Sequence, residues 1–157
     1  MLAGDRRALE GLPLKLLIMS LLISMTAPAV MGSLEGYERS ITKSEMASEA
    51  NRLAQIIQEV LSAGEGNRRS IIVELPTASS RYDMALEIGG GIDNASSYSV
   101  RCLEGDGVFA TVVLDDPPAR TTTLNGSPLR LDAGTISLML ECARIDARLI
   151  VVVEVRA

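Results

Sequence analysis

An uncharged stretch near the N-terminus constrains this chain more than any other feature. From Leu16 to Gly32 no side chain carries a charge, and most residues are apolar. A membrane-spanning helix needs about 20 mostly apolar residues, and the segment 12–32 is long enough to supply them. Three basic residues precede the stretch: Arg6, Arg7 and Lys15. We therefore predict a helix over 12–32 that enters a membrane, with the N-terminus inside the cell and the following chain outside.

Two prolines mark this helix. Pro13 suits the first turn of a helix, where its missing N–H costs nothing. Pro28 is expected to kink the helix or to end it. We expect the helix to begin near Leu14.

The helical pattern resumes after Gly32, and we predict that 33–63 is amphipathic. Apolar residues recur at steps of three and four and so trace one face of a helix: Leu34, Ile41, Met46, Ala50, Leu53, Ile57, Val60 and Leu61. Polar residues trace the opposite face: Glu45, Glu49, Arg52, Gln55 and Glu59. Gly64 is a suitable stop, because helices commonly end at a glycine. We expect the apolar face to pack on the C-terminal part of the chain.

After a linker at 64–69 the period changes to two, which predicts a β-rich domain over 70–157. The expected strands are Ser70–Leu75, Met84–Ile88, Ser97–Leu103, Val108–Leu114, Thr121–Leu124, a short run to Leu131, Thr135–Ala143 and Leu149–Val155. Asn125-Gly126 predicts a type I′ hairpin turn between two of them. The predicted fold class is α+β, with a long N-terminal helix followed by an antiparallel β-sandwich-like domain.

Composition and charge exclude several kinds of function. The 157 residues include no His and no Trp, so His-dependent triads and zinc sites are excluded. The formal net charge is −5, the opposite of the balance expected for a nucleic-acid-binding protein. No spacing selects a nucleophile with a base, and the acidic loop residues lack EF-hand spacing. We therefore expect no catalytic residue, cofactor or metal, and no nucleic-acid partner; the chain is not expected to be an enzyme.

Two cysteines and two sequons are candidates for modification. Cys102 and Cys142 fall on predicted inward faces of strands, and an exported domain favours a disulfide between them. Two buried thiols are the alternative, because free cysteine is often buried. The sequons begin at Asn94 and Asn125, both in predicted loops, where glycosylation is expected if this part lies outside the cell.

The N-terminal segment has three possible fates. Its basic start, its apolar core and the small residues Ala27-Pro28-Ala29 fit a cleaved secretory signal. The same residues fit an uncleaved signal anchor. A prepilin-type leader is the third reading, in which a peptidase cuts on the cytoplasmic side and leaves the apolar helix on the mature protein.

The order of these parts resembles type IV pilin-like proteins, in particular archaeal pilins and pseudopilins. Residues Arg6 to Leu14 look like the leader junction of that family, where a basic residue and then Gly or Ala precede the cut (class III signal peptide). Arg7-Ala8 matches this pattern, which implies cleavage before Leu9. Gly11 before Leu12 offers a second cleavage site, which would make the leader 1–11. Cleavage before Leu9 puts Pro13 at the fifth mature position, where many pilins carry Glu.

The resemblance implies a subunit of a cell-surface filament, either a pilin or a minor pilin. Its partners would be the membrane, a prepilin-type peptidase and other pilin-like subunits, in a homo- or hetero-oligomer. The residues expected to pack the helices together are apolar: Leu14, Leu16, Leu17, Ile18, Leu21, Leu22 and Ile23. The alternative is a secreted or membrane-anchored β-sandwich binding module that does not polymerise.

Overall fold

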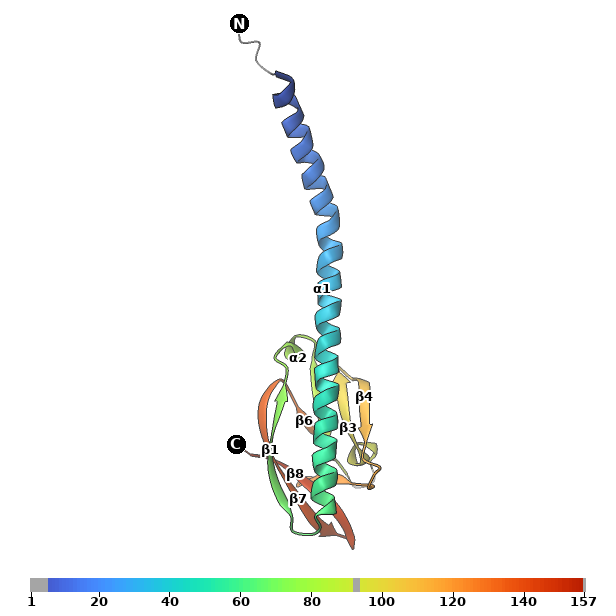
Figure 1. Ribbon diagram of the computed structural model, residues 1–157. Coiled ribbons are helices and arrows are strands. Elements are labelled where there is room, and N and C mark those ends of the chain that lie inside the picture. The colour runs from blue at the N-terminus through green and yellow to red at the C-terminus, as the bar shows by residue number, and fades with distance from the viewer. Residues whose placement is uncertain (1–5, 92–93, 157) are drawn as a thin grey trace. The chain divides into compact units, whose positions relative to one another are not determined.

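The structure is a computed structural model that describes residues 6–91 and 94–156; the side chains of 6–12 and of Ala95 lie outside the described part. The chain divides into two compact units, Met1–Ser40 and Ile41–Ala157. One long helix, α1 (Arg6–Ser62), is followed by two four-stranded sheets (Figure 1). The predicted α+β class is confirmed.

Helix α1 begins earlier than the sequence pattern suggests. Because it starts at Arg6, Pro13 lies inside the helix and not in its first turn. The helix also continues past Pro28, so of the two expected effects of this proline, a kink or an end, the end of the helix does not occur. Prolines are tolerated inside apolar helices where other groups, such as Ser and Thr side chains, satisfy the backbone groups that the proline frees.

The C-terminal end of α1 is as predicted. The helix ends at Ser62, and Gly64 follows with φ of +90°, a conformation that favours glycine. The Gly64 N–H donates to the Leu61 carbonyl at 3.0 Å, which satisfies one of the last helical carbonyls.

The first sheet, sheet A, has the strand order β1-β7-β8-β5. Its strands are β1 (Arg68–Leu75), β5 (Thr121–Thr123), β7 (Gly134–Ile145) and β8 (Arg148–Arg156). β1 pairs with β7, and β7 with β8, antiparallel; β5 pairs with β8 in parallel. The linker predicted over 64–69 is shorter in the structure, because β1 already begins at Arg68.

The second sheet, sheet B, has the order β4-β3-β2-β6, and all its pairs are antiparallel. Its strands are β2 (Met84–Ile88), β3 (Ser99–Glu104), β4 (Gly107–Val113) and β6 (Leu129–Leu131). A short helix, α2 (Ala78–Arg81), precedes β2, and a 3₁₀ turn, η1 (Ala95–Tyr98), precedes β3. The strand predicted over Ser97–Leu103 therefore begins later, because Ser97 and Tyr98 belong to this turn.

The hairpin predicted at Asn125-Gly126 does not form. A turn is present, with the Thr123 hydroxyl 2.6 Å from the Ser127 carbonyl and 2.8 Å from the Asn125 side-chain oxygen. The strands on either side nevertheless belong to different sheets, β5 to sheet A and β6 to sheet B. Each strand pairs with a partner distant in sequence, so the turn carries the chain from one sheet to the other.

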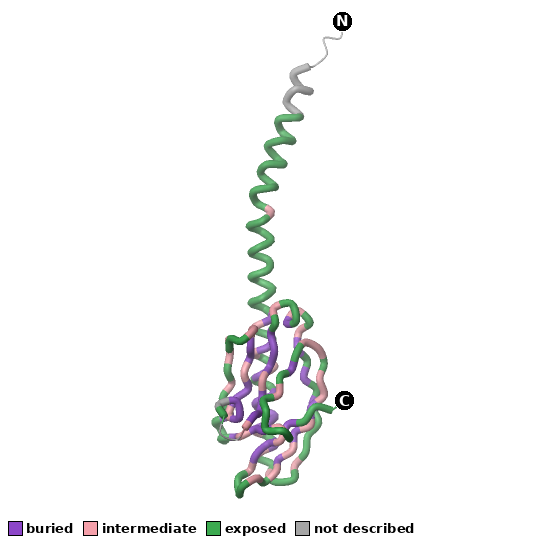
Figure 2. The backbone as a smooth tube through the Cα atoms, turned by 180° about the vertical axis from the view of Figure 1, so that it is seen from behind, coloured by how far each residue is buried: buried purple, intermediate pink, exposed green. Residues whose placement is uncertain are grey.

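One core joins the helix to both sheets (Figure 2). Its buried side chains from α1 are Met46, Ala50, Leu53, Ala54, Ile56, Ile57 and Val60. Sheet A contributes alternate residues such as Val73, Leu138 and Val151, and sheet B contributes Leu86, Ile88 and Val100. The second half of α1 is therefore an integral part of the β-rich unit.

Candidate functional site: an exposed apolar helix

The apolar residues predicted to pack helices together are all on the surface. Leu14, Leu16, Leu17, Ile18, Leu21, Leu22 and Ile23 are between 48% and 65% exposed. All residues of 13–40 are exposed apart from Ala27, which is partly covered. A run of exposed leucine and isoleucine of this length is not stable in water and indicates a partner surface or a lipid environment.

This helix is long and apolar enough to cross a membrane. Its most apolar window has a mean hydropathy of 1.9, and none of that window is buried within the chain. The predicted membrane-spanning helix is therefore present by length and composition. Which side of a membrane each end faces stays a prediction.

Four hydroxyl groups of this helix donate to backbone carbonyls of the helix itself. Ser20 donates to the Leu17 carbonyl at 2.9 Å, and Ser24 donates to the Leu21 carbonyl at 2.8 Å. Thr26 and Ser33 make the same kind of bond, each to a carbonyl four residues earlier. In an apolar environment an unpaired hydroxyl is costly, so these bonds fit the helix for lipid or for a packed protein interior.

The amphipathic half of α1 is held by both sheets. Its predicted apolar face is buried from Met46 to Val60, whereas Leu34 and Ile41 of that face are exposed. On the polar face, Glu59 forms an ion pair with Arg69 of β1. Lys43 forms an ion pair with Glu104 of β3 at 2.9 Å. The predicted packing of this face on the C-terminal part is confirmed.

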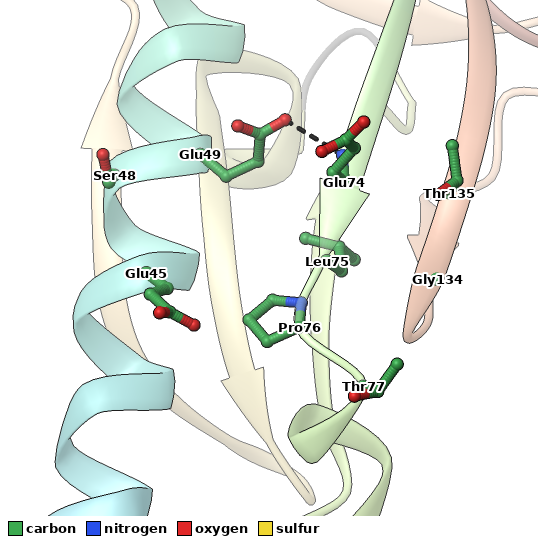
Figure 3. Close-up of a pocket in the computed structure, with 9 residues that line it drawn as sticks. All are labelled: Glu45, Ser48, Glu49, Glu74, Leu75, Pro76, Thr77, Gly134 and Thr135. Carbon is green, nitrogen blue, oxygen red and sulfur yellow. Dashed lines mark hydrogen bonds between the residues drawn. The ribbon is translucent and has the colours of Figure 1, made fainter.

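A carboxylate on α1 bonds to the outer edge of β1. Glu49 accepts a hydrogen bond from Arg52 Nε at 2.8 Å. It also accepts one from the backbone N–H of Glu74 at 3.2 Å, which Figure 3 shows. Arg52 also donates to the carbonyl of Ile72. Burial opposes the charge of Glu49, but these hydrogen bonds outweigh it and lower its pKa. The sequence analysis did not identify this contact, although the spacing of three residues between Glu49 and Arg52 is its signal.

Glu49 and Glu74 also line a pocket of about 460 Å³ between α1 and the end of β1 (Figure 3). Its lining contains three carboxylates, Glu45, Glu49 and Glu74, together with Ser48, Leu75, Pro76, Thr77, Gly134 and Thr135. Among the residues that the structure describes, no cluster of three His, Cys, Asp or Glu could hold a metal ion.

The predicted disulfide is not formed. Cys102 lies on β3 of sheet B and Cys142 on β7 of sheet A, and both are buried free thiols. The inward orientation predicted for both is confirmed, and the Cys102 sulfur lies 3.8 Å from the Met46 carbonyl. Burial raises the pKa of Cys102 to about 11, and burial also raises the pKa of Cys142. Both thiols lie in the core and act there as small apolar side chains.

Of the predicted modification and cleavage sites, only the two sequon asparagines have described side chains. Asn94 and Asn125 are exposed, and Asn125 lies in the turn between β5 and β6. Their glycosylation stays a prediction. The predicted leader residues Arg7, Ala8, Leu9, Gly11 and Leu12 belong to the first turns of α1, and their side chains lie outside the described part.

Comparisons with known proteins give no family for this chain: no family model, no curated protein and no solved structure matches it. The site is therefore defined by its own geometry: the exposed apolar part of α1. The rest of α1 packs into the core of the second unit, Ile41–Ala157, which we call the β unit.

Proposed function

We propose that this protein is a pilin-like structural subunit of a cell-surface filament, acting as a pilin or a minor pilin. A prepilin-type peptidase removes the leader before Leu9 or Leu12, and the retained helix anchors the subunit in the membrane before assembly. The apolar residues Leu14–Ile23 then pack against the same helix of neighbouring pilin-like subunits. The β unit stays outside the cell and faces solvent.

One observation carries this proposal: the uncharged, mostly apolar stretch from Leu16 to Gly32 is exposed apart from the partly covered Ala27, and the same helix then completes the core of the β unit. A cleavable export signal has no need to continue into the core of the exported domain. A helix with both properties is suited to hold a folded domain to an apolar structure made of other helices.

The physical argument for a filament follows from that surface. When an apolar helix leaves the membrane, its side chains must be buried elsewhere, and packing with identical helices achieves this. Contacts of head-to-tail type that do not close into a ring produce a filament. Such a role needs no catalytic residue.

The first test is the mature N-terminus of the protein from its native cell, measured by intact mass. A start at Leu9 or Leu12 supports the proposal. A start at Val30 contradicts it, because the apolar helix is then lost, and it supports the alternative of a secreted β-sandwich binding module. A start at Met1 also contradicts peptidase processing and leaves a simple membrane anchor.

A second test measures helix packing directly. Ile18→Cys places a thiol on the exposed apolar surface, whereas the two native thiols are buried. We expect oxidation of native membranes or filaments to cross-link Ile18→Cys subunits into dimers. Gln55→Cys, at an exposed position on the β unit, is the matched control and should give few cross-links. Equal cross-linking of both variants would contradict packing through the apolar helix.

A further inference from the structure

Each sheet has two edge strands, and three of these four edges are short or covered. An edge strand presents unpaired N–H and C=O groups to any chain that can pair with them. The outer edge of β1 is covered by α1, because Arg52 donates to the Ile72 carbonyl and Glu49 accepts from the Glu74 N–H. β5 and β6 have three residues each, so they offer little length for pairing. The remaining edge is β4.

Strand β4 is a long, open edge. It has seven residues with neither a charge nor a proline, and it pairs on one side only, with β3. Figure 1 shows β4 at the outer side of its sheet, with β3 between it and α1. Phe109 forms a bulge, since Cys102 pairs with Ala110 and Leu103 with Val108. The run Ala110–Val113 is regular and is the part of the edge that can accept another strand.

The hydrogen-bond pattern shows which groups face outward. The Leu114 N–H donates to the Tyr98 carbonyl of the neighbouring chain segment at 2.8 Å. Because backbone groups of an antiparallel strand point alternately to its two sides, the N–H and C=O of Thr111 and Val113 point to the open edge. The backbone groups of Ala110 and Val112 point to β3 instead, and their side chains pack against the core. The edge is therefore an ordered template for a further strand.

Charge selects the kind of strand that can pair here. Asp106 lies before the strand, and Asp115 and Asp116 follow it; all three are exposed and form no ion pair with any described residue. Two copies of β4 paired antiparallel about Thr111 would place Asp106 of one copy beside Asp116 of the other. Like charges in such positions repel, so self-pairing is disfavoured. A strand that carries a cationic residue at each end is attracted at one end by Asp106 and at the other by Asp115 and Asp116.

We propose that the open edge of β4 is a docking site for an extended peptide segment of another protein that carries lysine or arginine at both ends. The segment adds to sheet B as a fifth strand and pairs with the outward groups of Thr111 and Val113. Its basic ends lie beside Asp106 and Asp115–Asp116. This inference does not depend on helix assembly, because it uses only the β unit.

The test uses the full chain in detergent micelles and two synthetic peptides. The probe is Lys-Thr-Val-Thr-Val-Thr-Lys with a fluorescent label, and the matched control replaces both lysines with glutamate. Fluorescence anisotropy measures binding at low and at high salt. We expect the lysine peptide to bind at least about tenfold more tightly than the glutamate peptide at low salt, and to weaken as salt is added.

Thr111→Pro tests the strand pairing itself. This change removes an outward N–H without removing a bond to β3, and proline is accepted on edge strands in that orientation. We expect binding of the lysine peptide to fall about tenfold or more, while Thr111→Ala, which keeps the N–H, binds as the wild type does. The double variant Asp115→Lys with Asp116→Lys tests the role of charge independently. It should also weaken binding of the lysine peptide.

Several results would overturn the proposal. These are equal binding of the two peptides, no binding of either, or full binding to a folded Thr111→Pro variant. Self-association of the wild type that Thr111→Pro abolishes would also overturn it, because the occupant would then be a second copy. Circular dichroism and urea unfolding establish that each variant is folded. If Thr111→Pro does not fold, unchanged binding to the Asp115/Asp116 double variant overturns the proposal by itself.

Discussion

The two halves of α1 use similar residues for opposite purposes. Leu17 in the first half is 62% exposed, whereas Leu53 in the second half is fully buried in the core. The first half has apolar side chains on most faces, and the second half confines them to one face with charges opposite. The comparison teaches that the distribution of charge around a helix determines whether it completes a core within its own chain or needs another apolar surface.

The largest expected effect comes from truncating a leucine in each half. Leu53→Ala leaves a cavity in the core and is expected to lower the free energy of unfolding of the β unit by about 2–5 kcal/mol. Leu17→Ala, the matched control on the exposed half, should leave it within about 0.5 kcal/mol. Urea unfolding of the full chain in detergent measures both. Similar losses in the two variants would show that the halves are not energetically distinct.

A charge in the exposed half should instead affect membrane retention. Leu21→Arg adds an apparent insertion cost of about 2.5–3.5 kcal/mol if the residue lies near the centre of a membrane. We expect less protein in the membrane fraction and less in filaments, with unchanged urea unfolding of the β unit. Gln55→Arg, on the exposed face of the second half, should behave as the wild type does. Normal membrane retention of Leu21→Arg contradicts the proposed anchoring role.

A smaller effect is expected where α1 meets the edge of β1. Glu49→Gln weakens the bonds to Arg52 and Glu74 and should lower the free energy of unfolding by about 1 kcal/mol at pH 7. Because folding lowers the pKa of Glu49 from its usual 4.5, its contribution is complete above that value and is lost as the pH falls through the lowered pKa. Wild-type stability should therefore fall more steeply below pH 4.5 than that of Glu49→Gln. The control is Glu45→Gln, an exposed carboxylate of the same pocket.

The smallest effect concerns the buried thiols. With a pKa of about 11, roughly one Cys102 side chain in a thousand is ionised at pH 8. We expect iodoacetamide to react slowly with the folded protein and rapidly in urea, as intact mass would show. A reducing agent should leave the urea midpoint unchanged. A clear fall in that midpoint would show that the protein carries a disulfide after all.

The sequence predicts what depends on local pattern. The end of α1 at Ser62, the buried face through Met46, Leu53 and Ile57, and eight strands near their expected places all follow from periodicity and from Gly64. The exposed apolar surface of the candidate site follows in the same way from Leu16 to Ile23 being apolar on most faces.

The rest depends on long-range pairing that local pattern does not contain. Asn125-Gly126 has the residues of a hairpin turn, yet β5 pairs with β8 and β6 pairs with β2. The cysteines were correctly placed on inward faces, but inward faces of two different sheets do not by themselves bring two sulfur atoms together. Pro13 and Pro28 show that a proline does not by itself fix where a helix ends.

Residues 13–40 lead directly along the chain into the part of α1 that is packed in the β unit, and this has a mechanical consequence. A pull on residues 13–40 passes along helical backbone directly into Met46, Leu53 and Ile57, which are packed against both sheets. Release then requires many side chains to leave the core together, and resistance to force depends on the rate of that event. The Glu49 contact to β1 and the Lys43 ion pair to β3 would be among the first bonds to be strained.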